Sequence, residues 1–148
     1  MIKLKNSIYF FLILFFLIGC QANDNAANDP SFTKLSTTSH NQHLSNQIKD
    51  YLASDKDVTT ISAVNAGKDV IVTIEIPHMK RFRLATIREK LEKDIKKEFN
   101  LDKVEVSTDQ KIIMELDKLE KRIERDAITE DEIKKEVGRI MKLSKEET

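Results

Sequence analysis

The spacing of apolar positions between residues 40 and 54 is that of a helix with one hydrophobic face. The positions concerned, at i, i+4, i+7 and i+8, are Leu44, Ile48, Tyr51 and Leu52. Ser39 and Gln42 stand at the spacing of a capping box, in which two side chains bond the free backbone N–H groups of a helix start. The pattern predicts a first helix over residues 40–54.

Two extended segments follow, and both are rich in β-branched residues. Residues 58–64 contain Val, Ile and Thr, and residues 70–76 alternate apolar with polar positions. The inward positions of the second segment are Val70, Val72, Ile74 and Ile76. Residues 65–69 contain Asn, Gly and Asp, which favour a tight turn. Pro77 ends the second strand because proline has no N–H to donate. We predict a β-hairpin whose second strand is half-buried.

A long helical period covers residues 81–100, and a short alternating segment covers residues 103–107. The apolar stripe of this helix consists of Leu84, Ile87, Leu91, Ile95 and Phe99. A strand, a helix and a strand in succession imply a crossover that returns parallel to the first strand. We therefore predict an α+β fold. A small α-β-β-α-β domain, residues 39–108, has both helices on one face of a three-stranded mixed sheet.

Residues 109–148 carry two further amphipathic patterns among many charges. The first stripe, within residues 109–125, is Ile112, Leu116, Leu119 and Ile123; the second is Ile133, Val137, Ile140 and Met141. Thr129 and Glu132 form a capping box ahead of the second helix. This C-terminal helical hairpin either packs back on the sheet or projects to bind a partner helix. Intramolecular packing is the commoner use of such stripes, and we expect it here.

The beginning of the chain has a different pattern. A short basic start precedes residues 8–18, which are almost wholly apolar, and this is typical of a secretory signal peptide. A membrane-spanning helix needs about 20 apolar residues, and this run is shorter. A helix of a folded domain normally keeps a polar face, and this run has none. A soluble secreted form needs small residues before its cleavage site, where this chain has a bulky pair. We expect residues 1–19 to be a cleaved signal.

A lipobox-like sequence ends the apolar run: Leu17, Ile18, Gly19 and Cys20. It resembles the lipobox of bacterial lipoproteins, in which diacylglycerol is joined to the cysteine sulfur and a peptidase cuts just before that cysteine. The resemblance implies that Cys20 begins a mature protein held on a membrane by its lipid. Residues 20–38 are rich in Asn, Asp, Ser and Thr, so we expect a flexible tether. Within it, Phe32 and Leu35 are the residues suited to packing on the domain.

Charge and cysteine content narrow the classes of function. The chain has 25 basic and 25 acidic side chains. Removal of residues 1–19 takes away Lys3 and Lys5, which leaves 25 − 2 = 23 basic groups and a net charge of −2. This balance argues against binding nucleic acid by bulk electrostatics. With a single cysteine there is no internal disulfide, so the domain folds by packing alone.

Candidate catalytic and metal-binding residues are few. His40 and His43, at i and i+3, could bind one metal ion, but the sequence offers no further ligand beside them. We therefore interpret both as exposed polar residues at a helix start. The acidic run at residues 130–132 suits a helix N-terminus. The three glycines are scattered, so the sequence has no phosphate-binding loop. We expect no metal, no cofactor and no small-molecule substrate, and we interpret the chain as a non-enzymatic protein.

A basic junction lies between the second strand and the long helix. Residues 78–83 combine a histidine, an aromatic residue and three cations, which are Lys80, Arg81 and Arg83. These cations are candidates for contact with phospholipid headgroups. A solvated helix start, paired with nearby acidic residues, is the alternative.

The lipobox, the polar tether and the α-β-β-α-β pattern together are similar to the sporulation lipoproteins of the YhcN/YlaJ type. The local match lies in residues 102–109, a strand that ends in Ser-Thr-Asp ahead of a charged helix, preceded by a helix that ends at residues 97–100. The resemblance covers about residues 40–125 and carries no catalytic signature. It implies a membrane-attached protein of the spore or forespore, with a role in spore formation or germination.

These observations predict a lipid-anchored, non-enzymatic interaction protein on the extracytoplasmic face of the cell membrane or the spore inner membrane. Its expected contacts are the membrane, through diacylglycerol on Cys20, and a protein partner in the spore envelope. An accessory protein of an envelope enzyme and a ligand-sensing lipoprotein are the alternatives. A ligand sensor needs a pocket of several hundred Å³, and we expect a small core to leave little room for one.

Overall fold

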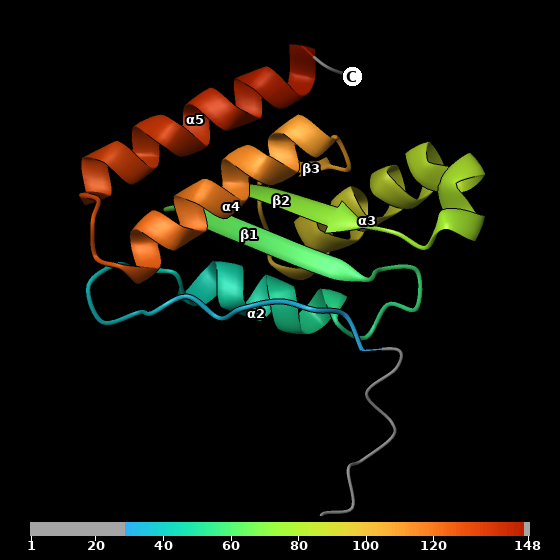
Figure 1. Ribbon diagram of the computed structural model, residues 1–148, viewed down its shortest axis with the longest axis horizontal. Coiled ribbons are helices and arrows are strands. Elements are labelled where there is room, and N and C mark those ends of the chain that lie inside the picture. The colour runs from blue at the N-terminus through green and yellow to red at the C-terminus, as the bar shows by residue number, and fades with distance from the viewer. Residues whose placement is uncertain (1–28, 147–148) are drawn as a thin grey trace, which may run out of the picture.

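A computed structural model describes residues 29–146 (Figure 1). The predicted signal peptide, the lipobox and Cys20 lie outside these residues. No helix within residues 29–146 is both long and apolar enough to cross a membrane. The elements in chain order are α2 His43–Leu52, β1 Thr60–Ala66, β2 Asp69–Glu75, the 3-10 helix η3 His78–Arg83, α3 Leu84–Glu98, β3 Lys103–Ser107, α4 Gln110–Glu124 and α5 Glu130–Glu146.

The three strands form one mixed sheet with β2 in the centre. β1 is antiparallel to β2, with Ala63 opposite Val72, and β3 is parallel to β2, with Val106 opposite Val72 on the other side. Gly67 in the β1–β2 turn has a φ of +63°, a conformation that glycine adopts at no steric cost. β2 ends two residues before Pro77. The predicted hairpin and the parallel return of β3 are confirmed.

Helices cover both faces of the sheet (Figure 1). One core lies between the sheet and the pair α2 and α3, and its helical members are Ile48, Leu52, Ile87, Leu91 and Ile95. A second core lies between the opposite face and the hairpin of α4 and α5, and its helical members include Ile112, Leu116, Leu119, Ile123, Ile133, Val137 and Ile140. The predicted α+β fold is confirmed, and the hairpin packs back on the sheet.

The prediction of a half-buried second strand was wrong. The four inward positions of residues 70–76 are buried as expected, but Ile71 and Thr73, which point to the opposite face, are buried too. Both lie under the C-terminal hairpin, whose packing position the alternation of residues 70–76 does not encode. A central strand covered on both faces is buried on both, and in β2 this burial runs without a break from Val70 to Ile74.

The first helix is shorter than predicted, and its capping box does not form. α2 begins at His43, and its cap residue Gln42 makes no capping bond with its side chain. The Gln42 amide instead donates to the Asn65 carbonyl at 2.9 Å and accepts from the Asn65 N–H at 3.1 Å. The side chain that the pattern assigned to capping therefore joins α2 to the end of β1.

The outer edge of β1 has a partner at each of three successive outward N–H groups. Ile61 donates to the backbone carbonyl of Ser31 at 3.0 Å. Ala63 donates to the carboxylate of Glu120 at 2.9 Å, and Asn65 donates to Gln42 as described above. An exposed sheet edge normally offers such groups to other chains, and here the protein itself occupies them.

Part of the predicted tether belongs to the folded domain. Ser31 forms a parallel bridge with Thr60 of β1, and the backbone of Leu35 bonds in both directions to the Asn46 side chain of α2 at 2.8 and 2.9 Å. Leu35 is buried and Phe32 packs against the first core. Phe32 and Leu35 thus pack on the domain as expected, and the part of the predicted tether before Asp29 lies outside the described residues.

Both helices of the α4–α5 hairpin are capped, and the cap of α5 is the predicted one. Asp109 accepts from the N–H groups of Lys111 and Ile112 at the start of α4. Thr129 and Glu132 form the expected capping box, with the Thr129 N–H 2.8 Å from the Glu132 carboxylate and the Glu132 N–H 3.3 Å from the Thr129 hydroxyl. Each cap satisfies N–H groups that the first turn leaves without a helical partner.

Candidate functional site

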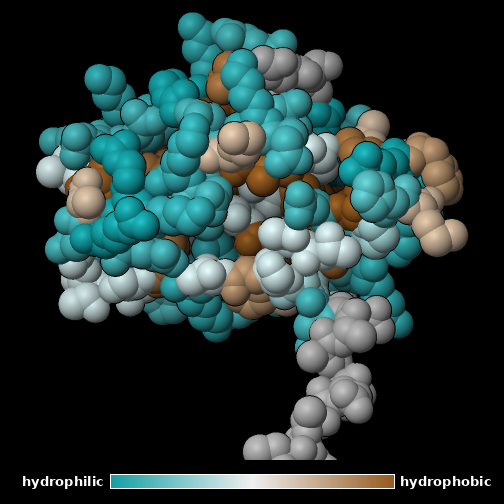
Figure 2. All heavy atoms as spheres, in the orientation of Figure 1, coloured by the Kyte–Doolittle hydropathy of each residue, from teal (hydrophilic) through white to brown (hydrophobic). Residues whose placement is uncertain are grey.

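The basic junction is a 3-10 turn in the structure, and the long helix begins after it. η3 occupies residues 78–83 directly behind Pro77, and α3 starts at Leu84, three residues later than predicted. No residue of η3 is buried. Met79 and Phe82 are 86% and 84% exposed, which makes them the most exposed large hydrophobic residues in the described chain. Figure 2 shows apolar side chains projecting at the right-hand end of the molecule, where Figure 1 places η3 and the start of α3.

The three cations of this turn have different roles. Lys80 forms an ion pair with Asp57 and donates to the carbonyl of Lys56 at 3.2 Å. It therefore ties η3 to the loop between α2 and β1. Arg81 and Arg83 form no hydrogen bond or ion pair within residues 29–146. Of the three cations predicted to face headgroups, these two have free guanidinium groups.

Two acidic residues of the loop between α2 and β1, Asp55 and Asp57, already have lysine partners. The hydrogen bond from Lys80 is the main cause that holds the pKa of Asp57 below its ordinary value, and Arg83 adds a weaker attraction. Asp55 pairs with Lys90 of α3 at 3.1 Å, which raises the pKa of that lysine. The positive charge of the two free arginines is thus not cancelled by this loop.

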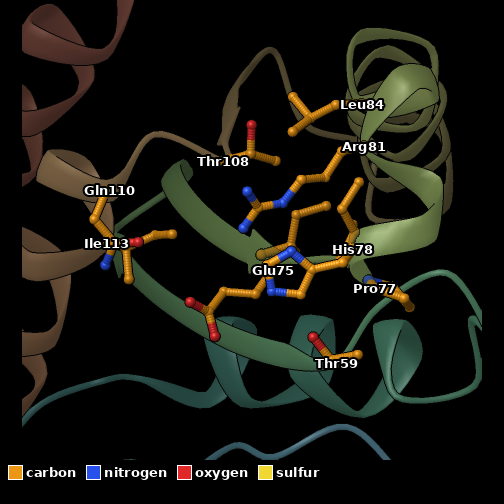
Figure 3. A pocket seen from close by; sticks show the side chains of 11 residues that line it. Thr59, Glu75, Pro77, His78, Arg81, Leu84, Thr108, Gln110 and Ile113 are labelled. Atoms are coloured by element: carbon orange, nitrogen blue, oxygen red, sulfur yellow. The ribbon is translucent and has the colours of Figure 1, made fainter.

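A hollow of about 520 Å³ lies behind the turn, at the carboxyl ends of the parallel strands β2 and β3. Figure 3 shows Arg81 and His78 reaching into it from η3, with Glu75 on its floor. The Glu75 carboxylate accepts from the Thr60 hydroxyl at 2.7 Å. Thr108, Gln110 and Ile113 line the opposite wall from the start of α4. The hollow lies between elements at the strand ends and not in the core, so it does not test the expectation that a small core leaves little room for a pocket.

A buried ion pair joins the two helical layers around the edge of β1. The Lys49 ammonium of α2 lies 2.7 Å from the Glu120 carboxylate of α4, and both side chains are almost fully buried. Lys49 also donates to the Thr33 carbonyl at 2.6 Å. Burial raises the pKa of Glu120, while Lys49 and the Ala63 N–H oppose the rise. Sequence reasoning missed this pair because each residue stands beside an apolar stripe and looks like an ordinary surface charge.

His40 and His43, the two candidate metal ligands of the sequence, have different environments. His40 precedes α2 and is buried, whereas His43 is exposed. The His40 ring lies 3.1 Å from Asp126 in the α4–α5 connection and 3.4 Å from Glu130 at the start of α5. The interpretation of His40 as an exposed residue of a helix start was therefore wrong. No group of three metal-ligating side chains forms within residues 29–146.

The model of the family described as sporulation lipoprotein YhcN/YlaJ matches residues 20–142. The chain belongs to this family. The match begins at Cys20 and extends through the sheet, both helical layers and most of α5. The C-terminal hairpin of this YhcN/YlaJ lipoprotein is thus part of the family pattern, beyond the residues 40–125 that carried the resemblance in the sequence. No curated protein and no solved structure matches the chain significantly.

Proposed function

We propose that this sporulation lipoprotein is held on the extracytoplasmic face of a membrane by diacylglycerol on Cys20. The observation that carries the proposal is the family match, which starts at Cys20, directly behind the lipobox-like Leu17, Ile18 and Gly19. Each buried methylene contributes about 0.8 kcal/mol to membrane binding, so two acyl chains hold a protein far more firmly than one. The folded domain then works within reach of the membrane surface.

At that surface the protein acts as a non-enzymatic interaction protein in spore formation or germination, with a protein partner in the spore envelope. Buried polar contacts hold this fold together. Lys49 and Glu120 join two helical layers, and the Ser144 hydroxyl of α5 donates to Glu105 of β3 at 2.9 Å. These contacts support a scaffold whose function lies in its outer surfaces.

Location and timing test this function. A tagged full-length chain should appear at the membrane of the developing spore and should be scarce during vegetative growth. The Cys20→Ala form, expressed at the same time, should lose the membrane location while keeping the timing. Equal abundance in vegetative cells and spores would contradict the sporulation role, and membrane location of the variant would contradict the lipid anchor.

The hollow favours a second candidate function, a ligand-sensing lipoprotein. Its volume is within the range of ligand sites, and it brings Arg81 and His78 together with Glu75 (Figure 3). Groups of both signs in one hollow suit a small zwitterion. Titration of the mature chain with free glycine, followed by NMR, should shift signals of these residues if the hollow is a ligand site, and signals elsewhere should stay in place.

A further inference from the structure

We propose that η3 is a second membrane contact: Met79 and Phe82 enter the interface of an anionic bilayer, and Arg81 and Arg83 bind lipid phosphates. The inference deepens the proposed membrane location and rests on it. It assigns a membrane-facing end to the folded domain. The experiment below measures this contact in a chain without lipid, so its failure leaves the anchor at Cys20 untouched.

The geometry of a 3-10 helix places the two apolar side chains together. Such a helix has about three residues per turn, so positions i and i+3 lie one above the other. Met79 and Phe82 stand at this spacing within η3. They are 86% and 84% exposed, against 53% for Met114 and 37% for Tyr51, the other exposed large hydrophobic residues described. A side-by-side apolar pair of this kind is suited to a bilayer interface.

The charges beside this pair match an anionic surface. Arg81 and Arg83 flank Phe82, and their guanidinium groups are free of protein partners within residues 29–146. Guanidinium binds phosphate through two parallel hydrogen bonds. Lys80, which directly precedes Arg81, is tied to Asp57, and this contact fixes the turn on the domain while the arginines remain available. The net charge of −2 on the mature chain opposes approach of the whole protein, so the contact is local and salt-sensitive.

The position of the tether directs the same end of the sheet to the membrane. Ser31 bridges Thr60 at the start of β1, and Thr60 lies opposite Glu75 at the end of β2, just ahead of η3. Figure 1 shows the first coloured residues and η3 toward the same end, away from the α4–α5 connection. Nine residue steps separate Cys20 from Asp29, which span at most about 30 Å. A lipid on Cys20 therefore keeps η3 close to the headgroups.

Vesicle co-sedimentation tests the contact. The protein is the mature chain, residues 20–148, with Cys20→Ala, and the vesicles are either pure phosphatidylcholine or an equal mixture with phosphatidylglycerol. Binding should require the anionic lipid and fade as salt is raised. Loss of both arginines, Arg81→Gln with Arg83→Gln, should weaken binding by about fivefold per charge. Loss of the apolar pair, Met79→Ser with Phe82→Ser, should weaken it at least as much.

Matched controls come from the two helices of the C-terminal hairpin. Lys134→Gln with Lys135→Gln removes two exposed cations from α5, and Met114→Ser removes an exposed methionine from α4. Both should leave binding unchanged. Control variants that weaken binding as much as the η3 variants would show general charge or hydrophobicity at work and would overturn the assignment to η3. Absence of binding to the anionic vesicles at low salt would overturn the contact itself.

Fluorescence distinguishes insertion from surface attraction. The chain has no tryptophan, so Phe82→Trp adds a single reporter and Met114→Trp adds a matched one. Emission from the first should move to shorter wavelength on anionic vesicles and be quenched by brominated lipid, and emission from the second should not change. A reporter at position 82 that stays in water would overturn insertion. Capture of the turn by a protein, with no response to vesicles, would do the same.

Discussion

Lys49 on α2 and Glu120 on α4 lie on helices that cover opposite faces of the sheet, and their charged groups meet 2.7 Å apart beside the edge strand β1. The carboxylate also accepts from the Ala63 N–H of that strand, and the ammonium donates to Thr33 in the N-terminal segment. Two side chains thus connect four parts of the chain at one buried point.

The first prediction concerns this pair. Lys49→Met leaves a buried carboxylate without its partner, and Glu120→Gln leaves a buried ammonium, so each should lower the free energy of unfolding by about 3–5 kcal/mol. The double variant removes both charges and keeps an acceptor for the Ala63 N–H. Urea unfolding should therefore show a loss in the double variant that is clearly smaller than the sum. Strict additivity would mean that the two charges do not stabilise each other.

The second prediction concerns pH and the tie between Lys80 and Asp57. The pKa of Asp57 lies below its ordinary value of 3.8 in the folded protein. The folded state then binds fewer protons than the unfolded chain. The contact therefore stabilises the folded state at pH values above the ordinary pKa, and this stabilisation disappears as the pH falls through the folded-state pKa. Between about pH 5 and pH 3, wild type should lose more stability than Asp57→Asn. Asp102→Asn, at an exposed aspartate without an ion pair in the described chain, should follow wild type.

The third prediction concerns the core under α2 and α3. Ile74 of β2 and Leu91 of α3 are 1% and 2% exposed and belong to the same cluster. Either residue changed to Ala should cost about 2–4 kcal/mol, through lost burial and the cavity left behind. Met114→Ala, at an exposed site, should cost little. A urea midpoint that moves equally in all three variants would contradict the assignment of the core.

The fourth prediction concerns the lipid. Metabolic labelling with a radioactive fatty acid should mark the wild-type protein and leave the Cys20→Ala form unmarked. The variant should also migrate as the longer precursor, because the peptidase of the lipobox pathway acts on the lipidated cysteine. Equal labelling of both forms would falsify the lipobox interpretation, whatever the outcome with vesicles.

Local patterns were sufficient for the parts of the fold that depend on neighbouring residues. Residues 103–107 were predicted as a strand and form one with the same bounds, and the Thr129 and Glu132 box forms as expected. The apolar stripe of α4 is buried at all four predicted positions. Periodicity and capping are properties of a few consecutive side chains, so the sequence displays them directly.

Contacts between distant residues were beyond such patterns. The sequence pattern places Ile71 on the solvent face of a half-buried strand, because nothing local shows that α4 and α5 cover that face. The sequence pattern also predicts a solvated His40, because its contacts with Asp126 and Glu130 join residues more than eighty positions apart. The candidate site divides in the same way. Residues 78–83 were visible as a basic junction, whereas the tie of Lys80 to Asp57 and the hollow beside Arg81 depend on tertiary packing.

The occupied edge of β1 affects how neighbouring copies of this lipoprotein can interact on a membrane. Proteins anchored to a membrane diffuse in two dimensions, so copies of one lipoprotein collide far more often than the same number free in solution. An open strand edge would invite sheet-to-sheet addition between such neighbours. Because Ser31, Glu120 and Gln42 already hold the outward N–H groups of Ile61, Ala63 and Asn65, dense patches of this lipoprotein can form on a membrane without polymerising through β1.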